Sequence, residues 1–371
     1  MSNSELKLPL YSKLSTILVG LIALFYILYV GKDIIIPLVF ATLLAILINP
    51  VVNFLTGKKI NRTIAILLSL ITAILILFGL AYFLAAQASL FTETFPLLKA
   101  KLIVLFENLV DSISKTFNVS TEGTKEWFEK MKSQGLENGT SVIGTTLLTI
   151  SSMLVLLILL PVYIFFILLY KSHLLEFTSR LFDREKHEVV AEVLVETRSL
   201  IQKYLVGLLL EAAIVATLNS IGLLILGVQY AILIGIIGAI LNIIPYVGGL
   251  VAITIPVVIA LATQTPITAL WVVLLYLIVQ FIDNNIIVPK IVASKVKING
   301  LVSIIVVLVG GALWGISGMF LSIPLIAIFK VIFDRIEGLK SFGFVLSEPT
   351  DSKNGPIFNF KIPIKLKKIK H

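Results

Sequence analysis

The two acidic residues best placed to form a buried polar site lie at the ends of one long uncharged stretch. Residues 212–282 contain no Asp, Glu, Lys, Arg or His, and these 71 residues are preceded by Glu211 and followed by Asp283. Ionisable side chains inside a bilayer are costly and usually face a cavity or the interior of a helix bundle. Glu211 is therefore a candidate proton or cation site. A carboxylate near the interface, solvated from the cytoplasmic side, explains its position equally well.

Amide side chains gather near Asp283 and widen the possible chemistry. Asn284 and Asn285 follow Asp283 directly, and Gln280 precedes it by about one helical turn. Carboxylate and amide oxygens are good acceptors, so this group could coordinate Na⁺ or hydrogen-bond a polyol. The alternative is that these side chains cap a helix end and join the membrane interface. Asn242 is a further candidate, because an unwound segment beside Pro245 would leave backbone carbonyls and its amide facing a cavity.

Helix-breaking and small residues mark where the chain could fold back within the membrane. Glycines act there through their size, because they let backbones approach closely at hairpin tips or helix crossings. Tyr246, like Trp314 and Trp271, could stack on a ring-shaped substrate. The residues of this kind that we assign to a substrate or ion site are Pro245, Tyr246, Gly248, Gly249, Gly310 and Gly311.

Composition predicts the environment that must hold these residues. The chain has 371 residues, of which 58% are hydrophobic and 14% are charged. Soluble domains average about 25% charged residues, so this is an integral membrane protein with the lipid bilayer as its first partner. The net charge of +9 is typical of basic cytoplasmic loops and does not require a nucleic-acid partner.

Several classes of enzyme are disfavoured. There is no Cys, so a thiolate nucleophile or zinc–thiolate site is excluded, and no Walker motif is present to hydrolyse ATP. The three His residues lie outside the expected spans, and paired membrane acids are absent unless the distant Glu211 and Asp283 meet. We therefore expect a protein that is not an enzyme and that uses no cofactor and no metal.

The hydropathy pattern predicts an all-α polytopic fold with about eight membrane segments. Residues 1–86 carry three membrane helices, at 14–31, 34–55 and 63–86, and residues 87–140 form an extracytoplasmic region of amphipathic helices. Residues 141–203 hold a fourth membrane helix followed by cytoplasmic amphipathic helices. Residues 204–337 form a transport core of interrupted segments, and residues 338–371 form a basic cytoplasmic tail.

Charge placement predicts that two of these segments are re-entrant hairpins. The basic loops at 57–62 and 171–203 should be cytoplasmic, which places both chain termini there as well. If each downstream segment crossed once, the Lys-bearing loop 283–299 would fall outside. A hairpin at 230–261 returns it to the cytoplasm, and a second hairpin at 301–330, opening inward, keeps the basic tail there. Both contain Val-Gly-Gly followed by Ile-Pro, and paired interruptions of this kind indicate a transporter binding site.

The motifs of the C-terminal half resemble those of the AI-2E family of autoinducer-2 exporter-like proteins. They are Gln202-x-Tyr204-x-x-Gly207, Asn242-Ile-Ile-Pro-Tyr-Val-Gly-Gly249, Gln280-Phe-Ile-Asp-Asn-Asn285 with Pro289-Lys290, and Gly310-Gly311-Ala-Leu-Trp-Gly315. Two mild departures are Gly249, where the family usually has Pro, and Asp283, where it has Glu. The resemblance implies a protein of the bacterial inner membrane that moves small solutes as a homo-oligomer, with a pentamer as the implied assembly.

Three functions follow from these observations. The first is a secondary transporter that exports a small polar organic solute, like autoinducer-2, by alternating access around the two hairpins. The second is a Na⁺(Li⁺)/H⁺ antiporter that depends on Glu211 and Asp283, since the resemblance includes members described as antiporters. The third is a non-transporting membrane scaffold or channel-like oligomer.

Overall fold

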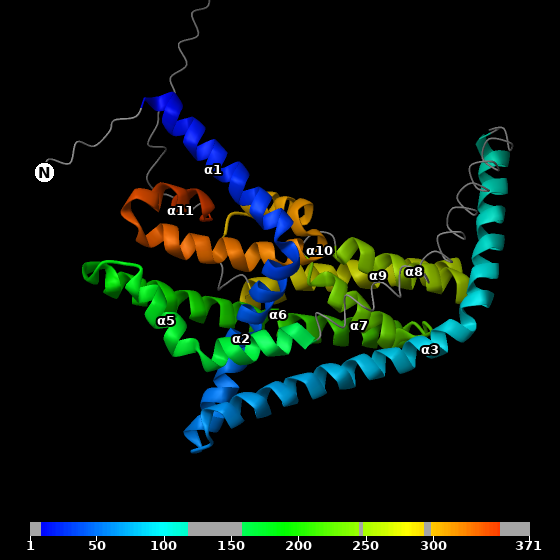
Figure 1. Cartoon of the computed structure of the whole chain (residues 1–371). Coiled ribbons are helices and arrows are strands. Elements are labelled where there is room, and N and C mark those ends of the chain that lie inside the picture. The colour runs from blue at the N-terminus through cyan, green and yellow to red at the C-terminus, as the bar shows by residue number, and fades with distance from the viewer. Residues whose placement is uncertain (1–8, 118–157, 245–247, 293–297, 349–371) are drawn as a thin grey trace, which may run out of the picture.

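The structure is a computed structural model that describes residues 9–117, 158–244, 248–292 and 298–348. Every named element within these ranges is a helix, apart from an isolated β-bridge between Ile298 and Ser347 (Figure 1). Five of these helices are long and apolar enough to cross a membrane. A sixth span results if the bent pair Ile158–Leu169 and Lys171–Arg180 counts as one. The predicted all-α, multi-pass membrane fold is confirmed.

The N-terminal helices are α1 (Leu10–Val30), α2 (Lys32–Gly57) and α3 (Arg62–Phe117). Most apolar side chains of α1 point outward, and Ile22 is 68% exposed, as expected of a helix that faces lipid. The helix Ile158–Leu169 packs with α2 and the start of α3 around small and branched side chains, which are Ala41, Ala45, Val52, Ala65, Ile66, Leu70, Ile164 and Leu168.

The third helix continues far beyond the span expected for it. We expected a membrane helix ending at residue 86 and a separate amphipathic helix in the polar region, but α3 is one helix of 56 residues. No glycine occurs from residue 80 to 117, and the helix continues through Pro96, the one strong helix breaker in this segment. Figure 1 shows α3 running along the bundle and then turning away from it. Residues 118–140, the rest of the region expected to form amphipathic helices, lie outside the described residues.

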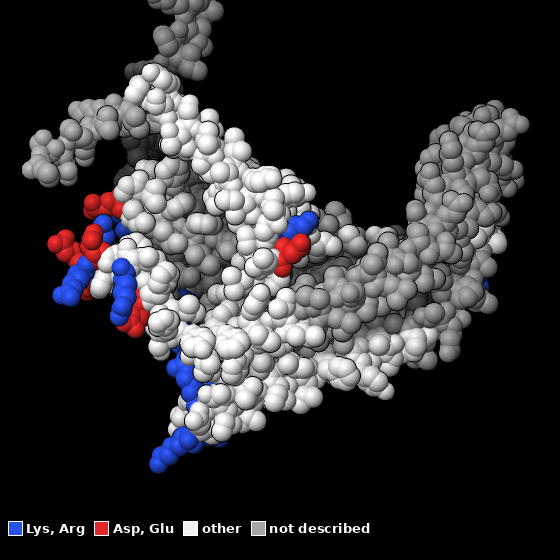
Figure 2. Space-filling view, in the orientation of Figure 1, with Lys and Arg blue, Asp and Glu red and all other residues white. Residues whose placement is uncertain are grey.

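A polar helical arm leads directly into the transport core. It consists of α5 (Lys171–Arg180), the short 3₁₀ turn η1 (Arg184–Lys186) and α6 (His187–Ile225). Helix α6 is uninterrupted over 39 residues, so its amphipathic first half joins the membrane half without a break. Figure 2 shows Lys, Arg, Asp and Glu side chains gathered mainly at one end of the molecule, where this arm lies.

The first interrupted segment forms a helical hairpin. Its helices, α7 (Ala231–Asn242) and α8 (Gly248–Thr263), contain 12 and 16 residues, about 18 and 24 Å of helix, and neither spans a core of about 30 Å alone. A Cβ built on Gly238 of α7 would lie 3.7 Å from Ala252 of α8, so the two helices run back along each other. The hairpin shape agrees with the prediction. Its side of entry into the membrane stays a prediction.

Helix α9 (Pro266–Ile282) follows, and it changes its hydrogen-bonding pattern where the polar motif begins. Thr265 caps its start by accepting a hydrogen bond from the Thr268 backbone. At Asp283 the chain becomes a π-helix, η2 (Asp283–Val292), which contains Pro289. Proline has no N–H to donate and its ring clashes with the carbonyl four residues earlier in an α-helix. The wider π-helical turn accommodates Pro289, and such turns are frequent at functional sites.

The second interrupted segment, α10 (Gly300–Arg335), is also a hairpin. Trp314 and Gly315 have non-helical backbone angles, and Gly315 has φ 61° with ψ −143°, a conformation reserved for glycine. The Ser322 hydroxyl donates to the Val306 carbonyl over 2.8 Å. These residues would lie about 24 Å apart along a straight helix, so the chain must fold back between them. The turn falls after Gly310 and Gly311, which lie in the first arm. The chain then continues through η4 (Glu337–Leu339) and α11 (Lys340–Leu346).

Candidate functional site

A cavity of about 710 Å³ lies where α6, the first hairpin, α9 and η2 meet. It extends to the first residues of α10 and to Glu348 beyond α11. Its walls are mostly apolar, and its polar side chains come from several elements that are distant in sequence. Those polar residues are Tyr204, Glu211, Asn242, Tyr276, Gln280, Asp283, Asn284, Ser303 and Glu348.

Asp283 is the most buried carboxylate of the site, with 1% of its surface exposed. The Asn242 amide, at the end of α7, donates a 2.8 Å hydrogen bond to one carboxylate oxygen. The other oxygen, Oδ1, has no hydrogen-bond partner among the described residues. A buried carboxylate that lacks a cation or sufficient donors is costly. This arrangement therefore favours a ligand that satisfies the second oxygen.

Glu211 lies on α6 and is 7% exposed. Its carboxyl group interacts electrostatically with that of Asp283, so the acids at the two ends of the uncharged stretch meet in the fold. Gly207, one turn earlier on α6, makes this possible. A Cβ at Gly207 would lie 2.7 Å from the Ile291 carbonyl oxygen, so α6 packs directly against the π-helix. No Lys or Arg among the described residues forms an ion pair with either carboxylate.

Amide groups complete the polar wall on the side of α8 and α9. The Gln280 amide donates to Asn284 Oδ1 over 3.3 Å, one turn along the helix. Gly249, at the start of α8, faces both Gln280 and Asn242, and a Cβ there would lie 2.9 Å from Gln280 Oε1. The absence of a side chain at residue 249 therefore keeps the amides accessible from the cavity.

Six of the twelve residues assigned from sequence line this cavity: Glu211, Asn242, Gly249, Gln280, Asp283 and Asn284. Asn285 is exposed and donates to the Phe281 carbonyl, as the alternative of helix-end bonding expected. Gly248 packs on the Leu241 backbone, Gly310 on Gly318 and Gly311 on Met319, so these three glycines contact protein rather than the cavity. Pro245 and Tyr246 lie outside the described residues.

Sequence reasoning did not assign to the site two tyrosines that line the cavity, Tyr204 and Tyr276, although Tyr204 belongs to one of the family motifs. Tyr204 interacts electrostatically with Glu211. Tyr276 lies seven residues before Asp283, two turns along the same face of α9, and that spacing could have identified it. Trp314, considered for stacking on a substrate, instead donates to the Leu28 carbonyl of α1 over 2.9 Å.

Buried polar atoms also extend away from the carboxylates. The Tyr276 hydroxyl, Asn219 Oδ1 and the Ser220 hydroxyl are all buried without a hydrogen-bond partner among the described residues. A Cβ at Gly238 would lie 3.2 Å from the Tyr276 hydroxyl and 3.6 Å from the Asn219 amide nitrogen, so these groups surround one point of α7. The polar character of the site thus continues between α6, α7 and α9.

The donor set favours protons, monovalent cations and polar organic groups. Across the described ranges, no group of three or more His, Cys, Asp or Glu side chains is arranged to hold a metal ion. Three carboxylates, three amides, two phenols and one serine hydroxyl can instead donate to and accept from a ligand rich in hydroxyl groups. The volume lies within the range of small-molecule pockets, about 300–1,000 Å³.

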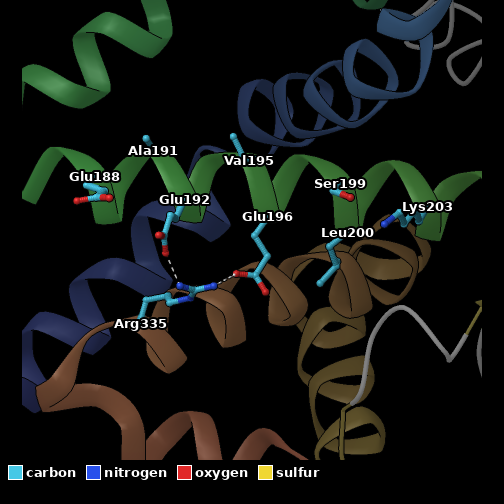
Figure 3. A pocket seen from close by; sticks show the side chains of 9 residues that line it. All are labelled: Glu188, Ala191, Glu192, Val195, Glu196, Ser199, Leu200, Lys203 and Arg335. Atoms are coloured by element: carbon cyan, nitrogen blue, oxygen red, sulfur yellow. Dashed lines mark hydrogen bonds and ion pairs between the residues drawn. The ribbon is translucent and has the colours of Figure 1, made fainter.

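A surface groove of about 850 Å³ lies farther along α6, beside the end of α10. Figure 3 shows Arg335 reaching from α10 to two glutamates on α6. Its guanidinium group pairs with Glu192 and, over 2.9 Å, with Glu196. These contacts join the end of the second hairpin to the helix that carries Glu211.

The chain is similar in sequence to known transport proteins. A model of the AI-2E family transporter matches residues 17–338. YueF of Bacillus subtilis (strain 168) is 28% identical over 319 residues, covering 81% of this chain and 83% of YueF. PerM of Escherichia coli (strain K12) is 29% identical over 208 residues, covering 55% of this chain and 59% of PerM. The AI-2 transport protein TqsA of Escherichia coli (strain K12) is 23% identical over 320 residues, covering 86% of this chain and 90% of TqsA.

Proposed function

This chain belongs to the AI-2E transporter family, and from that premise we propose that it is a secondary transporter exporting a small polar organic solute, such as autoinducer-2, across the bacterial inner membrane. The observation that carries the proposal is the 710 Å³ cavity between the interrupted segments, with carboxylate, amide and phenol groups on otherwise apolar walls. A hydroxylated solute of a few carbon atoms fits this volume and finds both donors and acceptors. TqsA, a relative, is named for transport of AI-2.

The paired carboxylates favour one alternative function. Glu211 and Asp283 interact in the cavity and neither has a basic partner within the described residues. Ionisable groups in this setting are typical of proton and cation relays in transporters. A Na⁺(Li⁺)/H⁺ antiporter would use these two acids as its exchange site. Assembly into a homo-oligomer stays a prediction.

Reconstitution into liposomes distinguishes the two functions. For an exporter, we expect labelled autoinducer-2 to cross vesicles that contain the protein faster than protein-free vesicles, without a requirement for Na⁺. For an antiporter, an imposed Na⁺ or Li⁺ gradient should move protons, measured with an enclosed pH dye. The absence of both signals in folded protein would contradict a transport function for this cavity.

The position of the cavity also predicts from which side of the membrane the site is accessible. It extends toward Gly300, Ser303 and Glu348, next to the loop that the distribution of Lys assigns to the cytoplasm. The chain contains no Cys, so a single Ser303→Cys substitution gives one labelling site. A membrane-impermeant thiol reagent is expected to modify it in inside-out vesicles and to leave it unmodified in right-side-out vesicles.

A matched position tests the same topology from the other side. Gln264→Cys, in the turn between α8 and α9, should show the opposite pattern if the first hairpin opens outward. Labelling of both positions from one side would contradict the two-hairpin topology.

A further inference from the structure

A cluster of positive charge lies away from the cavity, at one end of the core formed by α2, α3 and the helix Ile158–Leu169. The Lys171 ammonium group donates to Asn49 Oδ1 over 3.2 Å. The Arg62 guanidinium group donates to the Leu168 carbonyl over 2.8 Å, one of the free carbonyls at that helix end. Arg198 of α6 interacts electrostatically with Lys171. Arg62 and Lys171 therefore lie at the same helix end, and the charge of Arg198 acts on Lys171 from a third segment.

No acidic side chain in the described part of the chain balances this charge. Among the described residues, no Asp or Glu lies within ion-pair distance of Arg62, Lys171 or Arg198. Burial first, and then the charges of Arg198 and Arg62, lower the pKa of Lys171, which lies on the polar helix α5. Figure 2 likewise shows Lys and Arg without Asp or Glu at the corner where α2 turns into α3. Mutual repulsion of this kind is relieved by a bound anion.

A buried polar group gives a second, independent indication of a ligand. Asn49 is 3% exposed, and its amide nitrogen Nδ2 has no hydrogen-bond partner among the described residues. A buried donor without an acceptor costs about 1–3 kcal/mol. Because its Oδ1 accepts from Lys171, the amide lies beside the cations, and an oxygen anion seated there would satisfy it.

The position of the cluster along the chain indicates the source of the anion. Arg62 begins the apolar span Arg62–Gln87, and Lys171 lies two residues after the end of the apolar helix Ile158–Leu169. Both residues therefore lie where apolar segments end, at the level of lipid headgroups. Guanidinium groups bind phosphate oxygens in bidentate geometry, and basic pockets between membrane helices hold anionic headgroups.

We propose that Arg62, Lys171 and Arg198, together with the amide of Asn49, form a binding site for a phosphate group that an anionic phospholipid supplies. The lipid holds α2, α3, α5 and α6 together at one end of the bundle. This site is separate from the transport cavity, since none of its residues lines that cavity.

Lipid titration of the full-length protein in neutral detergent tests the site. Short-chain phosphatidylglycerol is expected to raise the thermal unfolding midpoint in a saturable manner, while phosphatidylcholine leaves it unchanged. Lys171→Gln and Arg198→Gln should each weaken phosphatidylglycerol binding about fivefold. Arg198→Lys keeps the charge and should retain most of the binding, which separates loss of the ligand from loss of the fold.

Two controls make the result decisive. Lys59→Gln removes one charge from the nearby exposed turn after α2 and should leave the affinity unchanged. An equal loss in this variant would overturn the proposal, because it would show diffuse attraction rather than a site. Inorganic phosphate is expected to give no comparable shift at the same concentration. If it does, the site takes a free anion and the assignment to a lipid is wrong.

Discussion

Replacing Asp283 by asparagine is expected to reduce transport in proteoliposomes to the level of protein-free vesicles while the protein still folds. Asparagine has nearly the same shape, and its oxygen can still accept the hydrogen bond from Asn242. It cannot ionise, so it can neither hold a cation nor exchange a proton. Glu211→Gln should have the same effect, because the two carboxylates interact within one cavity.

The control for this result lies on the same helix as Glu211. Glu188→Gln also removes one carboxylate from α6, but at an exposed position outside the transport cavity, and it should transport at the rate of the unmodified protein. Folding is checked by the thermal unfolding midpoint in detergent. If both site variants retain full transport, the carboxylates belong to the packing of the bundle, and the cavity loses its assigned role.

The second large effect is expected at the tight contact inside the second hairpin. A Cβ at Gly318 would collide with the backbone carbonyl of Gly310, so Gly318→Ala must push the two arms of α10 apart. Overpacking of this kind typically costs about 1–3 kcal/mol. We expect a lower thermal unfolding midpoint and, because the start of α10 borders the cavity, slower transport as well.

Gly79→Ala provides the matched control. Gly79 lies within α3, and a Cβ there would have no heavy atom within 4 Å. Alanine is favoured over glycine inside a helix by roughly 0.5–1 kcal/mol, so this variant should be as stable as the parent or slightly more stable. Equal behaviour of the two variants would show that the close approach of Gly310 and Gly318 does not support the fold.

Much of the fold could be predicted, because hydropathy and the placement of charge along the chain do not depend on which helices pack together. Hydropathy identified every apolar segment, and the conflict between single crossings and the Lys-bearing loop identified both interrupted segments. The length of α3 was missed because polarity after residue 86 was taken as a helix end. Polarity reports the environment of a helix and not its end, and even Pro96 does not end α3.

The sequence predicted those residues of the candidate site whose type is unusual at their position. Glu211 and Asp283 stood out because charge is rare in this half of the chain, and the amides beside Asp283 followed from their spacing. Whether the two acids meet could not be read from sequence, because that depends on Gly207 packing against the π-helix. Gly310 and Gly311 share a motif with Gly248 and Gly249, yet the second turn lies at Trp314 and Gly315. A repeated motif identified the hairpins without locating both tips.

The unbroken helix α6 connects the charged surface of the protein directly to the buried Glu211. Glu192 and Glu196 hold the end of the second hairpin through Arg335, and Glu211 lies farther along the same helix. The 19 residues from Glu192 to Glu211 span about 29 Å of helix. A tilt of about 5° around the Arg335 contact therefore displaces the Glu211 end by about 2.5 Å, nearly the length of a hydrogen bond. A rotation of this size at the surface would be enough to change which groups lie within hydrogen-bond distance of Glu211.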